Sequence, residues 1–302
     1  MSRRLRAWAP IAGAVLTLGV LVWRLGSGPF LDGLRSVDGG ALAAGAGIAV
    51  VTTACYGWRW KIVARGLGVD LSLRTAVAAY YRSVFLNVTL PGGILGDVHR
   101  GVSHGRDVSD VGLAMRAVVW ERFAGQIVQV LIAVIVLLAL PSPVRSFMPL
   151  VAIAVIAALV GVVLLARRWS DGAALLARRA WPGIALTSVL VVAGHAATFL
   201  IATRTAGTTA PASRVLPLAL LVIEAMALPN IAGWGPREGV AAWVFGAAGL
   251  GAGRGVATAV VYGVMTLVAS LPGAVVLVVA WFRRTRGPGR SRSQLRNRPA
   301  RA

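Results

Sequence analysis

Long apolar runs alternate with short basic segments along the chain, a pattern typical of membrane-spanning helices. A helix needs about 20 residues to cross a hydrocarbon core of about 30 Å. Six windows of roughly this size contain no Asp, Glu, Lys or Arg, and we expect each to be a full transmembrane helix: Ala7–Trp23, Ala41–Trp58, Phe123–Leu140, Phe147–Ala166, Ile184–Thr203 and Val256–Phe282. The pattern therefore predicts an all-α polytopic membrane protein.

The composition agrees with this prediction. Of the 302 residues, 57% are hydrophobic and 14% are charged, a balance that cannot cover a water-soluble globule of this size. A net charge of +21 would suggest nucleic-acid binding in a soluble protein, but here nearly all basic residues lie between or beyond the apolar runs. We therefore expect no nucleic-acid partner. The single cysteine, Cys55, excludes an internal disulfide framework.

The distribution of basic residues predicts the orientation of the spans, because Lys and Arg are enriched in cytoplasmic loops. With the N-terminus inside, the cytoplasmic segments hold 21 Lys and Arg residues and the opposite side holds six. Both termini are then cytoplasmic. We expect residues 1–285 to form one transmembrane domain and residues 286–302 to form a basic, disordered tail that touches an anionic lipid surface. Recruitment of an RNA or protein partner is the alternative for this tail.

Two further apolar stretches are interrupted by proline and glycine. Leu73–Leu90 breaks at Pro91–Arg100, and Val215–Leu228 breaks at Pro229–Glu238 before an apolar helix resumes. Proline removes a backbone donor and glycine admits unusual conformations, so each break should unwind the helix at membrane depth. Unwound backbone cannot face lipid, and it must face protein or a watery cavity. Ordinary kinks or extramembrane turns are the alternative.

The order of these segments predicts two re-entrant helices in an inverted repeat. If each broken segment returns to its own side, the first enters from the cytoplasm. Three full spans then separate it from the second, which enters from outside. Many transporters build a single site in this way and open it to either side. A full crossing by either segment would remove the inversion.

Ionisable residues within these segments are the candidates for a functional site, because a charge at membrane depth is costly and usually paired or functional. Asp97 and Arg100 are three residues apart and could pair on one helix face. Arg237 and Glu238 are adjacent and should point in different directions. We therefore expect each of them to find a partner elsewhere, in the other broken segment or at Glu121 and Arg122.

We predict that free amides at the two half-helix starts, together with Arg100 and Arg237, bind a phosphate or carboxylate. Asp97 and Glu238 would hold the arginines in place, or would simply complement the helix dipoles. The predicted substrate-binding residues are Arg100, Arg237, Asp97, Glu238, Glu121, Arg122, Gly92, Gly96, Gly233 and Gly235. His195 is expected to form an interhelical hydrogen bond, with proton relay as the alternative. We expect no catalytic residue, cofactor or metal.

Three segments indicate a particular protein family. They are Asn87–Arg100, which contains the sequences Leu-Pro-Gly-Gly and Gly-Asp, and the segments Glu121–Gly125 and Gly233–Gly239. Together they resemble the flippase-like transmembrane domain of bacterial lysylphosphatidylglycerol synthases, over about residues 5–285. The resemblance implies a polytopic domain with re-entrant helices in a bacterial cell membrane that moves a lipid or lipid-linked headgroup between leaflets. Fused members carry a cytosolic domain that attaches lysine or alanine to phosphatidylglycerol. With 20 residues after Phe282, we expect no synthase activity here.

Three functions stay open on the sequence alone. We favour a flippase whose partner is a membrane lipid with an anionic or zwitterionic headgroup. The chain contains no phosphate-binding Gly-Lys-Ser loop, so movement would be passive or driven by a gradient. The alternatives are a membrane-embedded lipid-modifying enzyme, with Asp97 or Glu238 as acid or base, and a scaffold that transports nothing. The sequence leaves the oligomeric state open.

Overall fold

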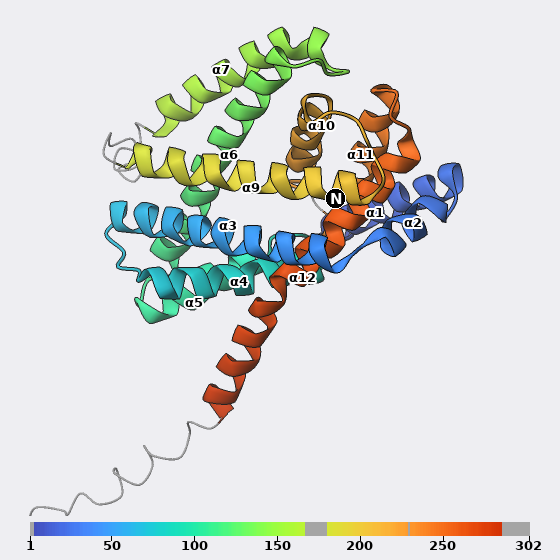
Figure 1. Cartoon of the computed structure of the whole chain (residues 1–302). Coiled ribbons are helices and arrows are strands. Elements are labelled where there is room, and N and C mark those ends of the chain that lie inside the picture. Colours follow the sequence, from blue (N-terminus) through green and yellow to red (C-terminus); the bar gives the residue numbers. More distant parts are fainter. Residues whose placement is uncertain (1–2, 167–179, 229, 286–302) are drawn as a thin grey trace, which may run out of the picture.

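The computed structural model describes residues 3–166, 180–228 and 230–285, and this part of the chain is helical, with no β-strand (Figure 1). It confirms the predicted all-α fold. In chain order the helices are α1 (Arg3–Leu25), α2 (Gly28–Ser36), α3 (Gly39–Gly66), α4 (Leu73–Thr89), α5 (Leu95–Asp107), α6 (Val111–Ala139), the 3-10 turn η1 (Arg145–Phe147), α7 (Met148–Ala166), α9 (Trp181–Thr205), α10 (Ala212–Ala225), α11 (Pro236–Ala247) and α12 (Ala252–Thr285).

Among the described residues, four helices are long and apolar enough to cross a membrane, namely α3, α6, α9 and α12. α1 and α2 pass the same test only as a pair bent by 98°, which is either one broken span or a re-entrant loop. The bend follows from Gly26, at a φ of +73°, and from Pro29 in the first turn of α2. The protein is thus a multi-pass membrane protein. The sixth predicted span corresponds to α7 and stays a prediction. The apolar helix found there, Arg145–Ala158, is shorter than the 18 residues required of a candidate span.

Several predictions fall outside the described residues. They concern four of the arginines counted as cytoplasmic, one proline of the second break and the C-terminal residues: Arg167, Arg168, Arg178, Arg179, Pro229 and residues 286–302.

Helices α3 and α9 form an antiparallel pair through the centre of the molecule. Glycines on α9 allow the close approach. A methyl group on Gly183 would lie 2.7 Å from Ile62 Cδ1, and one on Gly194 would lie 3.2 Å from Ile48 Cγ2. Small residues permit such contacts between membrane helices. Because the pairing is antiparallel, the C-terminal ends of α3 and α9 lie at opposite ends of the pair.

Each broken segment forms a helical hairpin, as the proline and glycine breaks predict. In the first hairpin, α5 returns along α4, and Asp97 on α5 accepts a hydrogen bond from Ser83 on α4 at 3.2 Å. In the second, α11 returns along α10, and Arg214 Nη2 near the start of α10 donates to the Ala248 carbonyl beyond the end of α11 at 3.0 Å. The hairpins follow α3 and α9 respectively, so they enter from opposite ends of that pair.

The tips of the two hairpins meet. The Gly92 amide donates to the Asn230 carbonyl at 2.8 Å, and Pro91 and Ile231 form an isolated β-bridge. This contact joins backbone segments 138 residues apart in sequence (residue 92 to residue 230). The unwound backbone of each break thus hydrogen-bonds to the other at this point, which favours its stability in a bilayer without water.

Helix α12 packs against both hairpins. Gly273 lies against the backbone of Tyr81 on α4, and Gly255 lies against the backbone of Ala241 on α11, in contacts too close for a Cβ atom. Helix α1 runs beside α11, where a methyl group on Gly235 would lie 2.7 Å from the Ala14 Cβ. These helices hold the hairpins together around one central region.

Candidate functional site

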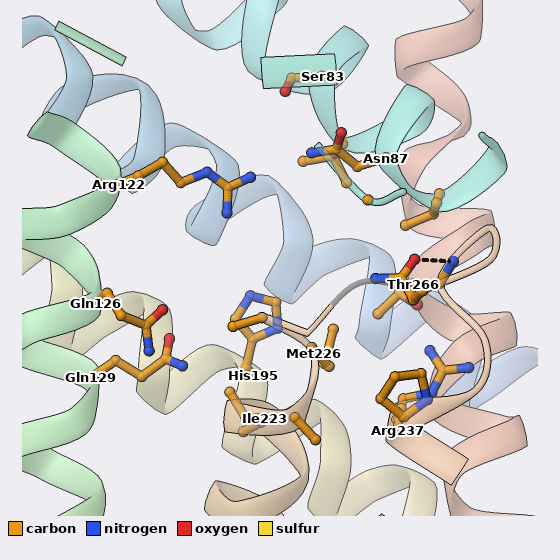
Figure 2. Close-up of a pocket in the computed structure, with 18 of the residues that line it drawn as sticks. Ser83, Asn87, Arg122, Gln126, Gln129, His195, Ile223, Met226, Arg237 and Thr266 are labelled. Atoms are coloured by element: carbon orange, nitrogen blue, oxygen red, sulfur yellow. Dashed lines mark hydrogen bonds between the residues drawn. The ribbon is translucent and has the colours of Figure 1, made fainter. Parts of the chain in front are cut away.

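A cavity of about 210 Å³ lies where the two hairpin tips, α6 and the α3–α9 pair come together. Figure 2 shows side chains that converge on it from α4, α6, α9, α10, α11 and α12. Its polar lining consists of Tyr56, Tyr80, Ser83, Asn87, Arg122, Gln126, Gln129, His195, Asn230, Arg237 and Thr266. The only charged side chains among the described lining residues are Arg122 and Arg237.

Behind one wall of the cavity lies a cluster of three arginines and two carboxylates. At its centre lies Glu121, which is fully buried. Its carboxylate accepts hydrogen bonds from Arg59 Nε at 2.8 Å, Arg100 Nη2 at 2.7 Å and the Tyr80 hydroxyl at 2.5 Å. The predicted Asp97–Arg100 pair is confirmed, with Arg100 Nε 2.9 Å from Asp97 Oδ1.

Arg122 completes this cluster and links it to the cavity. Its guanidinium forms a salt bridge with Asp97, while 53% of its side chain stays exposed. Arg59, Arg100 and Arg122 contribute three positive charges, and Asp97 and Glu121 contribute two negative charges. The cluster therefore has one positive charge in excess, and its exposed member faces the cavity.

Arg59 is the residue of this cluster that the sequence analysis missed. The charge count placed it on the cytoplasmic flank of the second span, but it is 4% exposed and lies inside α3, which continues to Gly66. Its guanidinium fits over Gly125 of α6, where a methyl group would lie 2.5 Å from Arg59 Cζ. The one signal for this contact in the sequence is the glycine four residues after Glu121.

The second charged pair, at the start of α11, corrects a prediction. Arg237 and Glu238 were expected to find separate partners, but they bond to each other, with Arg237 Nε 2.8 Å from Glu238 Oε1. The other Glu238 oxygen accepts the Gly235 amide at 2.7 Å. Both side chains bend back toward the helix N-terminus, as side chains in a first turn do, and there the two long chains meet.

Arg237 is held in a tight aromatic and glycine environment. Its Cζ lies 5.3 Å from the Trp234 ring centre and 5.8 Å from that of Tyr262. Gly263 of α12 provides the space for the guanidinium, because a Cβ there would lie 2.9 Å from Arg237 Cζ. The residue is 4% exposed, and that exposed part lines the cavity.

The structure separates the two arginines that the sequence placed in one anion site. Arg100 is 1% exposed and does not line the cavity, whereas Arg237 does. One amide at each helix start is also already used: the Gly96 amide donates to Asn87 Oδ1 at 2.8 Å and the Gly235 amide donates to Glu238. The charged groups that face the cavity are the side chains of Arg122 and Arg237.

Glycines at the breaks have the conformations that their position demands. Gly92, Gly233 and Gly235 have φ values of +102°, +81° and +113°, which other residues rarely adopt. Gly96 instead permits close packing, since a Cβ there would overlap the backbone of Ser83. Of these predicted site residues, Gly233 lines the cavity.

One asparagine holds each hairpin tip. Asn87 accepts the Gly96 amide and donates to Asp97 Oδ2 at 3.0 Å. Asn230 accepts the Gly233 amide at 2.8 Å. Both line the cavity, and neither was predicted as a site residue, because an asparagine next to a break resembles any other turn residue in sequence.

His195 joins three helices at the wall of the cavity. Its Nε2 lies 3.1 Å from the Tyr56 hydroxyl on α3, and its Nδ1 lies 2.7 Å from the Tyr262 hydroxyl on α12. The predicted interhelical hydrogen bond is confirmed, with two partners. Neither tyrosine was predicted, because contacts between distant spans leave no local pattern in the sequence.

The three sequence motifs thus lie in the two hairpins and at the central carboxylate between them. A family model described as the lysylphosphatidylglycerol synthase TM region matches residues 8–273. The chain belongs to this family. The matched residues include both hairpins, the charged cluster and every described residue that lines the cavity. No curated protein gives a significant match.

Membership of this family places the protein among membrane proteins related to lipid handling. The described residues contain no group of three or more His, Cys, Asp or Glu side chains that could hold a metal ion. The polar groups that the cavity offers are two guanidinium groups, the His195 imidazole, and hydroxyl and amide side chains.

Proposed function

We propose that this protein is a lipid flippase that moves a phospholipid or lipid-linked headgroup between the leaflets of a bacterial plasma membrane, with both termini in the cytoplasm. The observation that carries the proposal is the positive excess charge at the cavity. A cluster of three arginines with two carboxylates stays one negative charge short at membrane depth. A phosphate bound in the cavity would supply that charge.

The two guanidinium groups that line the cavity offer donors to a phosphate. Arg122 reaches the cavity from α6 and Arg237 reaches it from α11 (Figure 2). An arginine binds phosphate oxygens through two parallel N–H donors, and the bond strengthens where water is excluded. Each guanidinium also keeps a carboxylate partner, so neither is left as an unpaired buried charge when the ligand departs.

The cavity suits the headgroup and not the whole lipid. Its volume of about 210 Å³ is smaller than that of pockets for drug-sized molecules, which are roughly 300–1,000 Å³. The acyl chains would stay in the bilayer while the polar head crosses through the protein. This division removes the largest barrier to lipid movement, which is the desolvation of a charged head in hydrocarbon.

The hairpin arrangement suggests how the site could open to either side. The two hairpins would act as an inverted repeat, each forming one gate of a shared site. Among the described residues, the tips are joined by the Gly92–Asn230 backbone hydrogen bond and the Pro91–Ile231 bridge, and Gly93 packs against Asn230. Movement of one hairpin at a time would expose the arginines to alternate leaflets.

A proteoliposome assay tests the proposal. Purified protein is reconstituted with phosphatidylglycerol that carries a fluorophore on one acyl chain, and dithionite is added outside to bleach the accessible fluorophores. Without flipping about half of the signal is protected, and an active protein removes that protection. Arg237→Ala should abolish this loss, and Arg237→Lys should restore it poorly because an ammonium cannot form the two-pronged contact.

Two further variants make the result interpretable. Arg122→Gln changes a side chain that is 53% exposed, so it should fold normally while it slows lipid movement. Arg145→Ala changes an exposed arginine outside the cavity and should leave the rate unchanged. Equal raised rates for wild type, Arg237→Ala and Arg122→Gln would exclude the anion site, and a wild-type rate no higher than that of protein-free liposomes would favour a scaffold.

A further inference from the structure

Glu224, near the end of α10, differs from the other acidic side chains that lie between the membrane helices. Asp97, Glu121 and Glu238 each form a salt bridge with an arginine. Within the described part of the chain, the hydrogen bond to Glu224 comes instead from a neutral amide, because Gln126 Nε2 donates to its Oε2 at 2.7 Å. Gln129, three residues further along α6, is the second polar neighbour of this carboxylate. Glu224 thus meets glutamines where the other three meet cations.

An ionised Glu224 would be a charge without a counter-charge at membrane depth. The side chain is partly buried, and its Oε1 atom is buried with no hydrogen-bond partner among the described residues. A carboxylate in such a place is costly, and the usual remedy is that it takes up a proton and becomes neutral. An arginine neighbour would instead hold it ionised. The surroundings of Glu224 therefore favour a carboxyl group that can carry a proton.

Glutamine neighbours suit both forms of this acid. An amide has two N–H donors and a carbonyl acceptor, whereas a guanidinium has donors only. An ionised Glu224 accepts the N–H of Gln126, and a protonated one can in addition donate its O–H to the carbonyl oxygen of Gln129. Uptake of one proton forms one O–H bond and removes one negative charge, and release of the proton to water reverses both. The two amides can thus stabilise either state, as a reversible proton site requires.

The charged groups around α10 have other partners or lie further away. Helix α10 packs against α6, α9 and α11. The charged and titratable residues of these three helices are Arg116, Glu121, Arg122, His195, Arg204, Arg237 and Glu238. Those of α11 pair with each other, the Glu-Arg pair of α6 belongs to the cluster behind the cavity wall, and the histidine bonds to two tyrosines. Arg204 donates to the Thr208 carbonyl at 3.1 Å, and Arg116 lies ten residues before Gln126, about 15 Å along the axis of α6.

Gln126 connects Glu224 to the cavity, because it bonds to this carboxylate and also lines the cavity wall (Figure 2). A phosphate in the cavity and an ionised Glu224 would be like charges with one side chain between them, and in a site of low dielectric they repel. Protonation of Glu224 removes this repulsion. By linkage, a bound phosphate then favours the proton on Glu224, and the proton favours the phosphate to the same extent.

We propose that Glu224 is a reversible proton-binding site and that one proton crosses the membrane with each anionic headgroup. Movement of the α10–α11 hairpin, which carries Glu224, would open this site to water. The inference rests on the proposed function and adds its driving force. A pH gradient would draw the headgroup toward the more alkaline side. A singly charged phosphodiester and one proton together carry no net charge, so a membrane potential would not draw it.

Infrared spectroscopy of the purified full-length chain tests the proton site without transport. The C=O stretch of a protonated carboxyl group is distinct from the bands of a carboxylate, and exposed carboxyl groups are ionised above about pH 6. At neutral pH we expect this C=O band in the wild type, its loss as the pH is raised, and its absence in Glu224→Gln. Asp107→Asn removes an exposed carboxylate and should keep the band. A spectrum without the band, or a band that Glu224→Gln leaves unchanged, would overturn the proposal.

A matched pair of variants at Gln126 tests the role of the neutral neighbour. Gln126→Arg places a guanidinium beside Glu224 and should remove the C=O band, because the carboxylate then has a permanent counter-charge like the other three. Gln126→Met has nearly the same length and no charge, and it should keep the band. A band of equal strength in both variants would show that the arginine-free surroundings do not determine the protonation of Glu224.

A second experiment tests coupling in proteoliposomes that contain phosphatidylglycerol with a short fluorescent acyl chain. The share of labelled lipid in the outer leaflet is taken from the first, rapid phase of its extraction by albumin. With an alkaline interior the label should collect in the inner leaflet, up to about tenfold for each pH unit at one proton per lipid. A protonophore should abolish this asymmetry, and a potassium potential set with valinomycin should not create it. Glu224→Gln should show no asymmetry under the pH gradient.

Failure of this inference and failure of the flippase give different results. Lipid movement that ignores the pH gradient, or that follows the membrane potential, would refute coupling to a proton and leave the flippase standing. Equal extraction from proteoliposomes and protein-free liposomes would refute the flippase and with it the shared crossing. The infrared band and its loss in Glu224→Gln would then still decide whether Glu224 binds a proton.

Discussion

Replacing Glu121 by Gln should strongly destabilise the protein, because this carboxylate is the centre of the buried charged cluster. Glu121 is 0% exposed and joins Arg59 on α3, Tyr80 on α4 and Arg100 on α5 to its own helix, α6. The substitution keeps the shape of the side chain but removes one negative charge. The excess positive charge of the cluster then rises from one to two.

The structure sets the magnitude of the effect. A glutamine keeps one acceptor oxygen, and its amide N–H groups then face a guanidinium, so donors oppose donors. Breaking a buried ion pair by removal of one partner costs about 3–5 kcal/mol. Many folded domains have a total stability of about 5–15 kcal/mol, so the variant should lie near the limit of folding.

Reversible unfolding of the purified protein by SDS in mixed micelles, followed by tryptophan fluorescence, measures this loss. The control is Glu224→Gln, whose carboxylate accepts a hydrogen bond from Gln126, and we expect that variant to lose about 0.5–1.5 kcal/mol. Adding Arg59→Met to Glu121→Gln removes the second excess charge and should recover part of the loss. A Glu121→Gln variant as stable as Glu224→Gln, with no recovery in the double variant, would refute the buried cluster.

Two further predictions concern Arg237 and the orientation. Gly263→Ala should push the Arg237 guanidinium from its place, since a Cβ there would lie 2.9 Å from Cζ, and it should reduce lipid movement while the protein still inserts into the membrane. Retained activity in the proteoliposome assay would contradict this. Single cysteines at Ser142 and Thr209 should react with an impermeant maleimide in intact cells, in a Cys55→Ser background, and one at Ser291 should react only after lysis. Labelling of Ser291 in intact cells would reverse the orientation.

The sequence predicted the hairpins well because their signals are local. Proline and glycine at Pro91–Gly93 and Gly233–Gly235 impose unusual backbone conformations on any helix that contains them. The bend between α1 and α2 has a similar local cause at Gly26 and Pro29, but the analysis of spans considered only the apolar run before it. Counting apolar residues finds a span and overlooks the turn that follows.

The pairing of charges was harder to predict because it depends on contacts between distant segments. Arg59 lies 62 residues before its partner Glu121 (residue 59 to residue 121), and nothing near either residue identifies the other. The positive-inside count treated Arg59 as a flank, although the helix continues beyond it. The prediction for Arg237 and Glu238 was wrong for a different reason. It relied on the directions of side chains along a regular helix, and these two residues occupy the first turn of α11.

The buried motif residues and the residues that line the cavity have different roles, and this difference limits what family membership says about the lipid. The motif residues Asp97, Arg100, Glu121 and Glu238 are buried, and each bonds to protein, so they build the scaffold of the site. The cavity is also lined by groups from outside the motifs, Gln126, Met226 and Thr266 among others, beside the motif residues Asn87 and Gly233. A relative could keep every motif and change the charge at such positions. We therefore expect the motifs to specify the architecture and the cavity wall to specify the lipid.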